Sequence, residues 1–178
     1  QQISSFKICS SAYYLLSQKY QKRQDFIMAP KIDKSMFMFM EQEGKVCHRK
    51  PGDLDGKDFL IDGCKNCTIV LEDHTAQVQI DYCEDCVIFL GPVNGPCFIR
   101  NSKNITLKLV CQQLRTREIE NCDILMINDQ PSIEMSKNIR FGTWDASDYP
   151  LLEEQMKKAD MPMPKGKWKN IYDFSPKN

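Results

Sequence analysis

Apolar and polar residues alternate with a period of two from about residue 59 to residue 143, and this period is typical of half-buried β-strands rather than of helices. A short polar turn interrupts the alternation at regular intervals. The turns occupy residues 64–67, 83–86, 102–105, 119–122 and 136–139, so their spacing is 19 residues at first and then 17. Such a period indicates an internal repeat, which is stronger evidence for the fold class than the propensities of single segments.

Equivalent positions of successive repeats carry similar side chains: two apolar columns precede the turns, and a triplet of alternating residues follows each turn. A unit of two short strands and a turn in about 18 residues is too short for a βαβ crossover and fits one rung of a parallel β-helix. We therefore predict an all-β fold, a parallel β-helix of about five coils, whereas an antiparallel sandwich would show hairpin turns without a shared register. The residues predicted to face inward are Phe59, Val78, Cys97, Leu114 and Pro131; Ile61, Ile80, Ile99, Thr116 and Ile133; Cys67, Ile69 and Leu71; Cys86, Ile88 and Leu90; Ile105, Leu107 and Leu109; Cys122, Ile124 and Met126; and Ile139, Phe141 and Thr143.

The segment before the repeats has a different character. Residues 1–30 predict an N-terminal helical extension, because residues 11–24 contain neither Gly nor Pro and are rich in helix-forming residues. Tyr13, Leu16 and Tyr20 share one face of this helix at helical spacing. An amphipathic helix of this kind is suited to a partner interface.

Residues 31–178 are expected to form the β-helix domain, including a C-terminal cap. Residues 36–40 are expected to pack over the first coil, and residues 150–160 read as a short helix. Solenoids need such flanking segments, because an open coil end exposes unpaired strand edges. The third side of each coil is expected to be a variable linker, formed by residues 72–76, 91–96 and 128–130. The side chains expected to anchor the C-terminal segment are Trp168, Ile171, Tyr172 and Phe174.

Composition limits the classes of partner. Of the 178 residues 42% are hydrophobic, which is enough for one domain with a real core. The 24 Lys and Arg residues balance the 24 Asp and Glu residues, so no global basic field favours nucleic acid or an anionic membrane surface. No apolar run approaches the ~18 residues that span a bilayer, and no signal peptide or Gly-led acylation motif is visible. We expect a cytoplasmic protein with no nucleic-acid partner and no membrane anchor.

Four cysteines of the first two turns match the spacing of a zinc ribbon. Cys64, Cys67, Cys83 and Cys86 form two C-x₂-C pairs, and four such thiolates can surround Zn²⁺. Later repeats place Ile, Ser or Cys at the same positions, and a column that accepts isoleucine is an apolar site. Buried thiols are therefore the favoured interpretation, and no metal or other cofactor is expected. No Walker loop, Gly-rich nucleotide fingerprint or Ser/His/Asp motif indicates catalysis on a substrate of its own.

The strand positions that alternate with the inward columns concentrate charge on one outer face. Arg100 lies beside Arg117 in one outward column, and Phe98 lies beside Arg115 in the next. A solvated face with weak charge ladders explains this pattern. A binding face for an anionic or carboxylate-rich partner is the alternative, because an anion would relieve like charges one strand spacing apart. The outward columns are Asp62, Asp81, Arg100, Arg117 and Glu134; Leu60, Gln79, Phe98, Arg115 and Ser132; and Asp58, Gln77, Pro96, Gln113 and Gln130.

A series of ordered motifs resembles the tubulin-binding cofactor C domain family (C-CAP/cofactor C-like), most closely its branch of GTPase-activating proteins associated with X-linked retinitis pigmentosa. The similarity covers about residues 31–176, and so many matches in one order are highly specific. The motifs are FLID at 59–62, C-x-x-CVIFLGPV at 83–93, CQQLRTR at 111–117, QPSIE at 130–134, NIRFG at 138–142 and W-x-NIYDF at 168–174.

The resemblance implies a right-handed β-helix that stimulates GTP hydrolysis by a partner, either tubulin or an Arf-like small GTPase. The arginine finger of the family's Gln-Gln-x-Arg motif corresponds to Arg115, and its paired glutamines correspond to Gln112 and Gln113. The partner-binding glutamate of the Gln-Pro-x-x-Glu motif corresponds to Glu134. The other expected partner-binding residues are those of the outer face around Arg115: Arg117, Arg100 and Phe98.

Two functions are compatible with these motifs. The first is a GTPase-activating domain that acts through Arg115 on nucleotide bound to the partner and has no catalytic activity of its own. The second is a non-catalytic structural or adaptor component of a microtubule or ciliary assembly, to which the helix at residues 11–24 would contribute. Both imply a location at the cytoskeleton, the cilium or the basal body.

Overall fold

The computed structural model describes residues 33–127, 131–164 and 169–176. The chain divides into two units, Gln1–Asp33 and Lys34–Asn178, and the second unit contains all the elements described below. The helix expected at residues 11–24, the linker at 128–130 and Trp168 lie outside the described residues.

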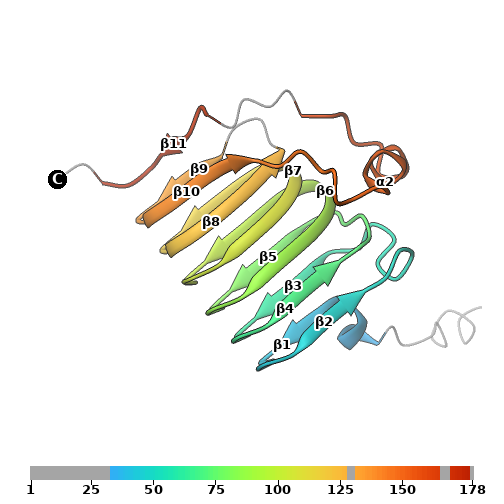
Figure 1. Cartoon of the computed structure of the whole chain (residues 1–178), viewed down its shortest axis with the longest axis horizontal. Helices are drawn as coiled ribbons and strands as arrows, with labels where there is room; N and C mark the ends of the chain where they lie inside the picture. The colour runs from blue at the N-terminus through green and yellow to red at the C-terminus, as the bar shows by residue number, and fades with distance from the viewer. Residues whose placement is uncertain (1–32, 128–130, 165–168, 177–178) are drawn as a thin grey trace, which may run out of the picture. The chain divides into compact units, whose positions relative to one another are not determined.

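Lys34–Asn178 is a coil of strands joined into one sheet, as Figure 1 shows. A short 3₁₀ helix, η1 (Lys34–Phe37), leads into it, and the described strands pair in parallel. The arrangement is a β-solenoid of about five turns, which confirms the predicted fold class. The strands are β1 (Met38–Met40), β2 (Val46–Arg49), β3 (Phe59–Asp62), β4 (Thr68–Leu71), β5 (Val78–Asp81), β6 (Val87–Arg100), β7 (Thr106–Arg117), β8 (Glu120–Ile127), β9 (Ser132–Glu134), β10 (Lys137–Thr143) and β11 (Tyr172–Asp173).

Alternate strands build two faces of the coil. The first face consists of β1, β3, β5, the C-terminal halves of β6 and β7, and β9. The second face consists of β2, β4, the N-terminal halves of β6 and β7, β8 and β10. On the first face Phe98 pairs with Arg115 and Arg100 pairs with Arg117, so the register predicted from the repeat is confirmed. Within the run at 36–40, residues 38–40 form β1, which pairs with β3 and so stacks on the first predicted coil as a further strand.

The polar turns of the repeat change direction at residues in the left-handed conformation. Asn and Asp adopt this conformation at lower cost than other non-glycine residues, which explains their position in the turns. The side-chain amide of Asn138 donates to Asn121 at 3.0 Å, and that of Asn104 donates to Asp85 at 2.8 Å, so the turns stack in a ladder. The residues of this column, with φ between 51° and 55°, are Asn66, Asp85, Asn104, Asn121 and Asn138.

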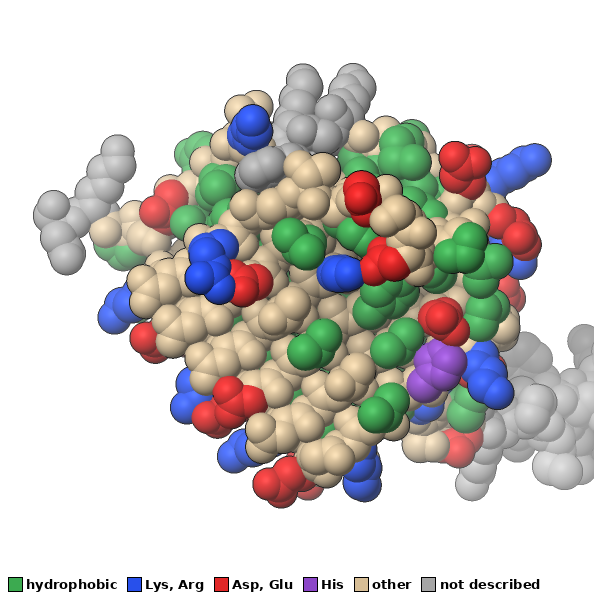
Figure 2. Space-filling view, in the orientation of Figure 1, with side chains coloured by type: hydrophobic (Ala, Val, Ile, Leu, Met, Phe, Trp, Pro, Cys, Tyr) green, Lys and Arg blue, Asp and Glu red, His purple; other side chains and the backbone are tan. Residues whose placement is uncertain are grey.

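A ladder of alternating charge runs beside these turns. The Lys103 ammonium lies 2.7 Å from the Glu84 carboxylate, and the backbones of the other members pair side by side in the same alternating order. Opposite charges one strand spacing apart favour this register over pairings that place like charges side by side. Figure 2 shows red and blue side chains alternating along the lower left edge. The ladder consists of Glu43, Lys65, Glu84, Lys103, Glu120 and Lys137.

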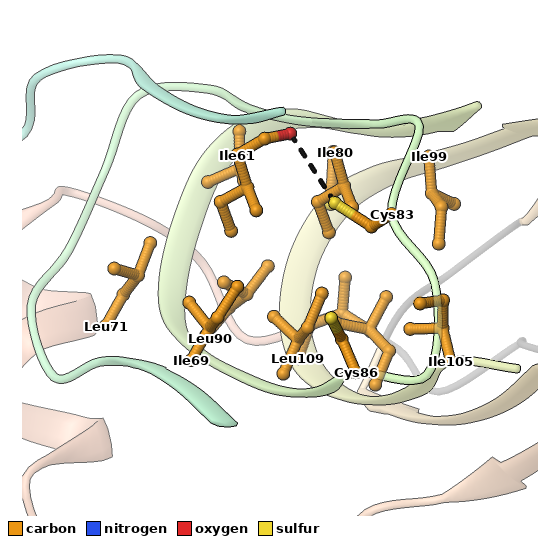
Figure 3. Close-up of a cluster of buried hydrophobic side chains, with 14 of the residues drawn as sticks. Ile61, Ile69, Leu71, Ile80, Cys83, Cys86, Leu90, Ile99, Ile105 and Leu109 are labelled. Carbon is orange, nitrogen blue, oxygen red and sulfur yellow. Dashed lines mark hydrogen bonds between the residues drawn. The ribbon is translucent and has the colours of Figure 1, made fainter. Parts of the chain in front are cut away.

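The inward columns fill the interior, part of which Figure 3 shows. Ile61, Ile80 and Ile99 are fully buried, and burial of each such side chain contributes about 1.5–3 kcal/mol. The last coil differs, because no described strand pairs with β10 on the side away from β8. Phe141 is only half-buried there and Thr143 is exposed, although both pair in register with buried residues of β8, so the predicted inward column continues into this coil without becoming core.

The expected linker at residues 91–96 is instead part of a continuous strand. β6 runs for 14 residues, and its pairing with β7 shifts register between Phe89 and Pro92 and again between Val93 and Pro96. Each shift places one extra residue on β6. Together they account for the difference between the 19-residue and 17-residue repeats. Gly95 lies in the second shift, where a Cβ atom would lie 2.5 Å from a backbone oxygen of the previous coil.

A separate hydrophobic cluster covers part of the second face and holds the predicted short helix, α2 (Leu152–Lys158). Phe89 points outward from β6, and its ring makes edge contacts with Trp144 and Tyr149 at centroid distances of 5.3 and 4.9 Å. Leu152 and Met156 pack into the same cluster, and Figure 2 shows green side chains gathered near α2. Within the described residues, no helix has the length and hydropathy that crossing a membrane requires.

Candidate functional site

A groove of about 920 Å³ lies on the first face of the coil. The outward surfaces of β6, β7 and β9 contribute to its lining, as does β11, which pairs with β9. All the residues that the sequence singled out as catalytic or partner-binding line this groove, so the structure brings the predicted set together. They are Arg115, Gln112, Gln113, Arg117, Glu134, Arg100 and Phe98.

Arg100 is neutralised within the groove. Its guanidinium donates to both carboxylate oxygens of Asp81, at 2.7 and 2.6 Å, and to the side-chain oxygen of Gln79 at 3.0 Å. The hydrogen bonds to Asp81 raise the pKa of Arg100 above its ordinary value. Bidentate pairing of this kind fixes the plane of the guanidinium. Arg100 therefore shapes the groove but brings little net charge to it.

Arg117 also has acidic neighbours. Its Nε atom lies 3.4 Å from the carboxylate of Glu118 and 3.9 Å from that of Glu134, and its side chain is 56% exposed. Both contacts are longer and more open than that of Arg100, so they are worth less energy. Glu134 shares the groove with Arg117, as the outward column predicts.

Arg115 differs from the other two arginines. Its exposed side chain projects from β7, donates to the side-chain oxygen of Gln113 at 3.2 Å, and places its guanidinium 6.0 Å from the ring centre of Phe98. In the described part of the chain, no carboxylate lies within ion-pair distance of it. Among the three groove arginines, Arg115 alone has no counter-charge from the residues that the structure describes.

Gln112 is held by a residue that the sequence analysis missed. Its side-chain amide nitrogen donates to the side-chain oxygen of Asn94 at 2.7 Å, and the Asn94 nitrogen donates to the carbonyl oxygen of Ala159 at 2.6 Å. Asn94 belongs to the segment that was expected to be a linker. The signal that points to it is the change of repeat length from 19 to 17 residues, because the register shifts occur there.

The C-terminal aromatic residues line the groove and are not buried anchors. Tyr172 is 56% exposed and Phe174 is 61% exposed, and Ile171 is also exposed, so the prediction that they anchor the C-terminal segment is wrong. Backbone bonds hold the segment instead: the amide of Tyr172 donates to Pro131 at 2.9 Å, and that of Phe174 to Ile133 at 2.8 Å. The two rings lie 4.4 Å apart and form an apolar part of the groove.

The cysteines behave as interior side chains. The turn cysteines Cys64, Cys67, Cys83 and Cys86 are at most 2% exposed, which confirms that they are buried thiols. Burial raises the pKa of Cys86 to about 11, whereas the hydrogen bond that Cys64 shares with Cys83 lowers the pKa of Cys64 and raises that of Cys83. Over the ranges that the structure describes, no group of three or more His, Cys, Asp or Glu side chains is arranged to hold a metal ion.

The groove of the β-solenoid thus contains charged side chains and the Gln-Gln-x-Arg motif. The family model described as "Tubulin binding cofactor C" matches residues 56–174, which is more than half of the chain. The protein therefore belongs to the tubulin binding cofactor C family, and the resemblance carried by its motifs is confirmed.

Its relatives include two kinds of protein. Protein XRP2 of Homo sapiens is 40% identical over 156 residues, covering 87% of this chain and 44% of that protein. Protein XRP2 of Danio rerio is 37% identical over 161 residues, covering 90% and 43%. Tubulin-specific chaperone C of Homo sapiens is 24% identical over 138 residues, covering 77% and 40%. The chain thus spans less than half the length of these relatives.

Proposed function

We propose that this domain activates GTP hydrolysis by a bound partner and that Arg115 is the arginine finger that it supplies. The observation that carries the proposal is the exposed guanidinium of Arg115, which has no carboxylate neighbour among the described residues. Arg100 and Arg117 are already in contact with acidic side chains. Arg115 can therefore bring an uncompensated charge to a phosphate without first breaking an ion pair.

The chemistry of phosphoryl transfer accounts for the effect of such a residue. Negative charge develops on the phosphoryl oxygens in the transition state, and a planar, permanently cationic guanidinium meets it with two parallel donors. The expected acceleration is about 10³- to 10⁵-fold, which corresponds to about 4–7 kcal/mol. The nucleotide belongs to the partner, so this chain needs no phosphate-binding loop.

The neighbours of Arg115 have supporting roles in this proposal. The hydrogen bond to Gln113 holds the guanidinium in the unbound protein. Exchanging this neutral bond for phosphate oxygens costs about 1 kcal/mol, far less than the finger contributes. Phe98 pairs with Arg115 on the neighbouring strand, 6.0 Å from its guanidinium, and restricts its side chain, while Gln112 and Glu134 of the same groove contact the partner.

The partner is expected to be an Arf-like small GTPase or tubulin. The first follows from the resemblance of the motifs to the GTPase-activating branch of the family, and the second from the tubulin-specific chaperone among the relatives. Either partner would place the protein at the cytoskeleton, the cilium or the basal body.

A single-turnover GTP hydrolysis assay with each partner tests the proposal. Arg115→Ala should lower the stimulated rate by about 10³- to 10⁵-fold, and Arg115→Lys should lose most of the same effect because an ammonium lacks the planar fork. Arg140→Ala is the matched control, since Arg140 is 82% exposed and pairs with Asp123 on the second face. This control should retain the wild-type rate.

The adaptor function predicts a different set of results. If the wild-type protein activates a partner and the Arg115→Ala variant activates it equally well, the arginine finger is refuted. If the wild-type protein accelerates neither partner and binds with no preference for the GTP-bound form, the results favour a non-catalytic role in a larger cytoskeletal or ciliary complex.

A further inference from the structure

We infer that Asn94 is a positioning residue that fixes the amide orientation of Gln112, so that Gln112 presents its carbonyl oxygen to the occupant of the groove. The kinetic consequence of this inference rests on the proposed function, whereas the orientation itself does not. Asn94 lies on β6 at the second register shift, and Gln112 lies on β7 directly before the Gln113–Pro96 pair. The two amides are 2.7 Å apart.

The orientation follows from a chain of donors and acceptors. A backbone carbonyl oxygen can only accept, so the Asn94 group that contacts Ala159 at 2.6 Å must be its nitrogen, Nδ2. The other end of the same amide, Oδ1, then faces Gln112 and can only accept. Gln112 must therefore donate through its nitrogen, Nε2, as the structure shows. The Oε1 atom of Gln112 accepts no hydrogen bond from the described residues and is available in the groove.

The carbonyl at the start of this chain is itself fixed. Ala159 is the C-cap residue of α2, and its own amide donates to the carbonyl of Gln155 at 2.9 Å. α2 is held by the hydrophobic cluster on the second face and by Gln155, whose side-chain nitrogen donates to the backbone of Glu72 at 2.8 Å. The orientation of Gln112 is therefore set by a rigid element of the domain rather than by solvent.

The register shift explains why this contact forms at Asn94. The extra residue of the longer coil bulges out of the ladder, and a bulge re-aims the side chains beside it. Gly95 permits the close approach that the bulge requires, since a Cβ atom there would clash with Ala76. The occupant that this site selects is a donor, such as a partner amide N–H or a water that the partner orients. A group with only acceptor atoms would face Oε1 without a hydrogen bond.

Two substitutions of Asn94 separate positioning from simple structural support. Asn94→Asp keeps the acceptor for Gln112 but loses the donor to Ala159, whereas Asn94→Ala loses both. In the ¹⁵N-labelled full chain, we expect the side-chain amide of Gln112 to stay protected from exchange in Asn94→Asp, and its signals to move and exchange faster in Asn94→Ala. Asn138→Ala, a change in the exposed ladder of the turns, is the control and should leave these signals in place.

The same variants are then assayed for partner activation. The stimulated rate divided by the half-saturating concentration should fall about three- to tenfold in Asn94→Ala, as expected for one neutral hydrogen bond, and should be largely retained in Asn94→Asp. Both variants should lower the melting temperature, because both lose the bond to α2. Equal losses of rate in the two variants, or unchanged Gln112 signals in Asn94→Ala, would overturn the inference. If Arg115→Ala has no effect while the Gln112 signals behave as described, the arginine finger fails and the positioning role of Asn94 stands.

Discussion

The aromatic pair in the groove gives a quantitative prediction for Phe174→Ala. Phe174 is 61% exposed although it lines a groove. An aromatic side chain offers about 150–250 Å², so about 100–150 Å² of Phe174 is left for a partner to cover. At about 25 cal/mol per Å², complete coverage is worth about 2.5–4 kcal/mol, of which binding realises only a part. We expect truncation to cost about 1–2 kcal/mol, or about 5- to 30-fold in Kd.

Titration calorimetry with the partner bound to a non-hydrolysable GTP analogue measures this effect. The fold should be unaffected, because backbone bonds from Tyr172 and Phe174 hold β11 on β9. The melting temperature therefore checks that only the surface has changed. Val46→Ala is a control on the second face, where Val46 is 78% exposed and lies outside the groove lining. A Kd for Phe174→Ala within twofold of the wild-type value would show that the partner does not cover this ring.

Two further predictions concern the coil that supports the groove. Burial raises the pKa of Asp73, but hydrogen bonds from the backbone amides of Asp55, Leu54 and His74 outweigh it and hold this pKa below its ordinary value. A lowered pKa contributes stability above about pH 4 that is lost as the pH falls through the folded-state pKa. Asp73→Asn turns an N–H toward these donors, so it should lower the free energy of unfolding, measured in urea at pH 7, by about 1–3 kcal/mol. The variant should also lose less stability than the wild-type protein at acid pH. An unchanged pH profile would contradict this reasoning. Glu84→Lys would place a third lysine beside Lys65 and Lys103 in the charge ladder, and should lower the melting temperature at low salt with partial recovery in ~1 M salt. A shift independent of salt would show that the ladder charges do not set the register.

The sequence predicts the coil well because the alternation within each repeat unit determines which of its residues are buried. Each column repeats at the same place in every unit, so alternation alone identifies Ile61, Ile80 and Ile99 as stacked core residues. The outward register follows by the same reasoning, and it places Phe98 beside Arg115 without any knowledge of function. The prediction of burial from the repeat fails where the stack ends, as the exposed Thr143 shows. The period alone does not indicate which coil is the last.

The C-terminal segment was predicted less well for a physical reason. Aromatic residues near a chain end are usually interpreted as anchors, since burying a ring contributes more than burying most side chains. β11 is only two residues long and is fixed by backbone hydrogen bonds, so its rings do not need to be buried. The alternation of Tyr172 and Phe174 around Asp173 is a strand pattern, but two residues are too few for a period to be recognised.

A uniform solenoid would bury its inward columns equally well with any side chains on its outer faces. The residues that distinguish one function from another are therefore expected where the repeat is broken. Three departures from the repeat meet at the groove. The change from 19 to 17 residues brings Asn94 to Gln112, and the column that holds Gln79 and Phe98 changes to a charged residue at Arg115. The third is the short strand β11, which lines the groove with exposed rings. Because each departure arises from a different cause, their convergence on one surface supports a site that acts on a partner rather than a by-product of stacking.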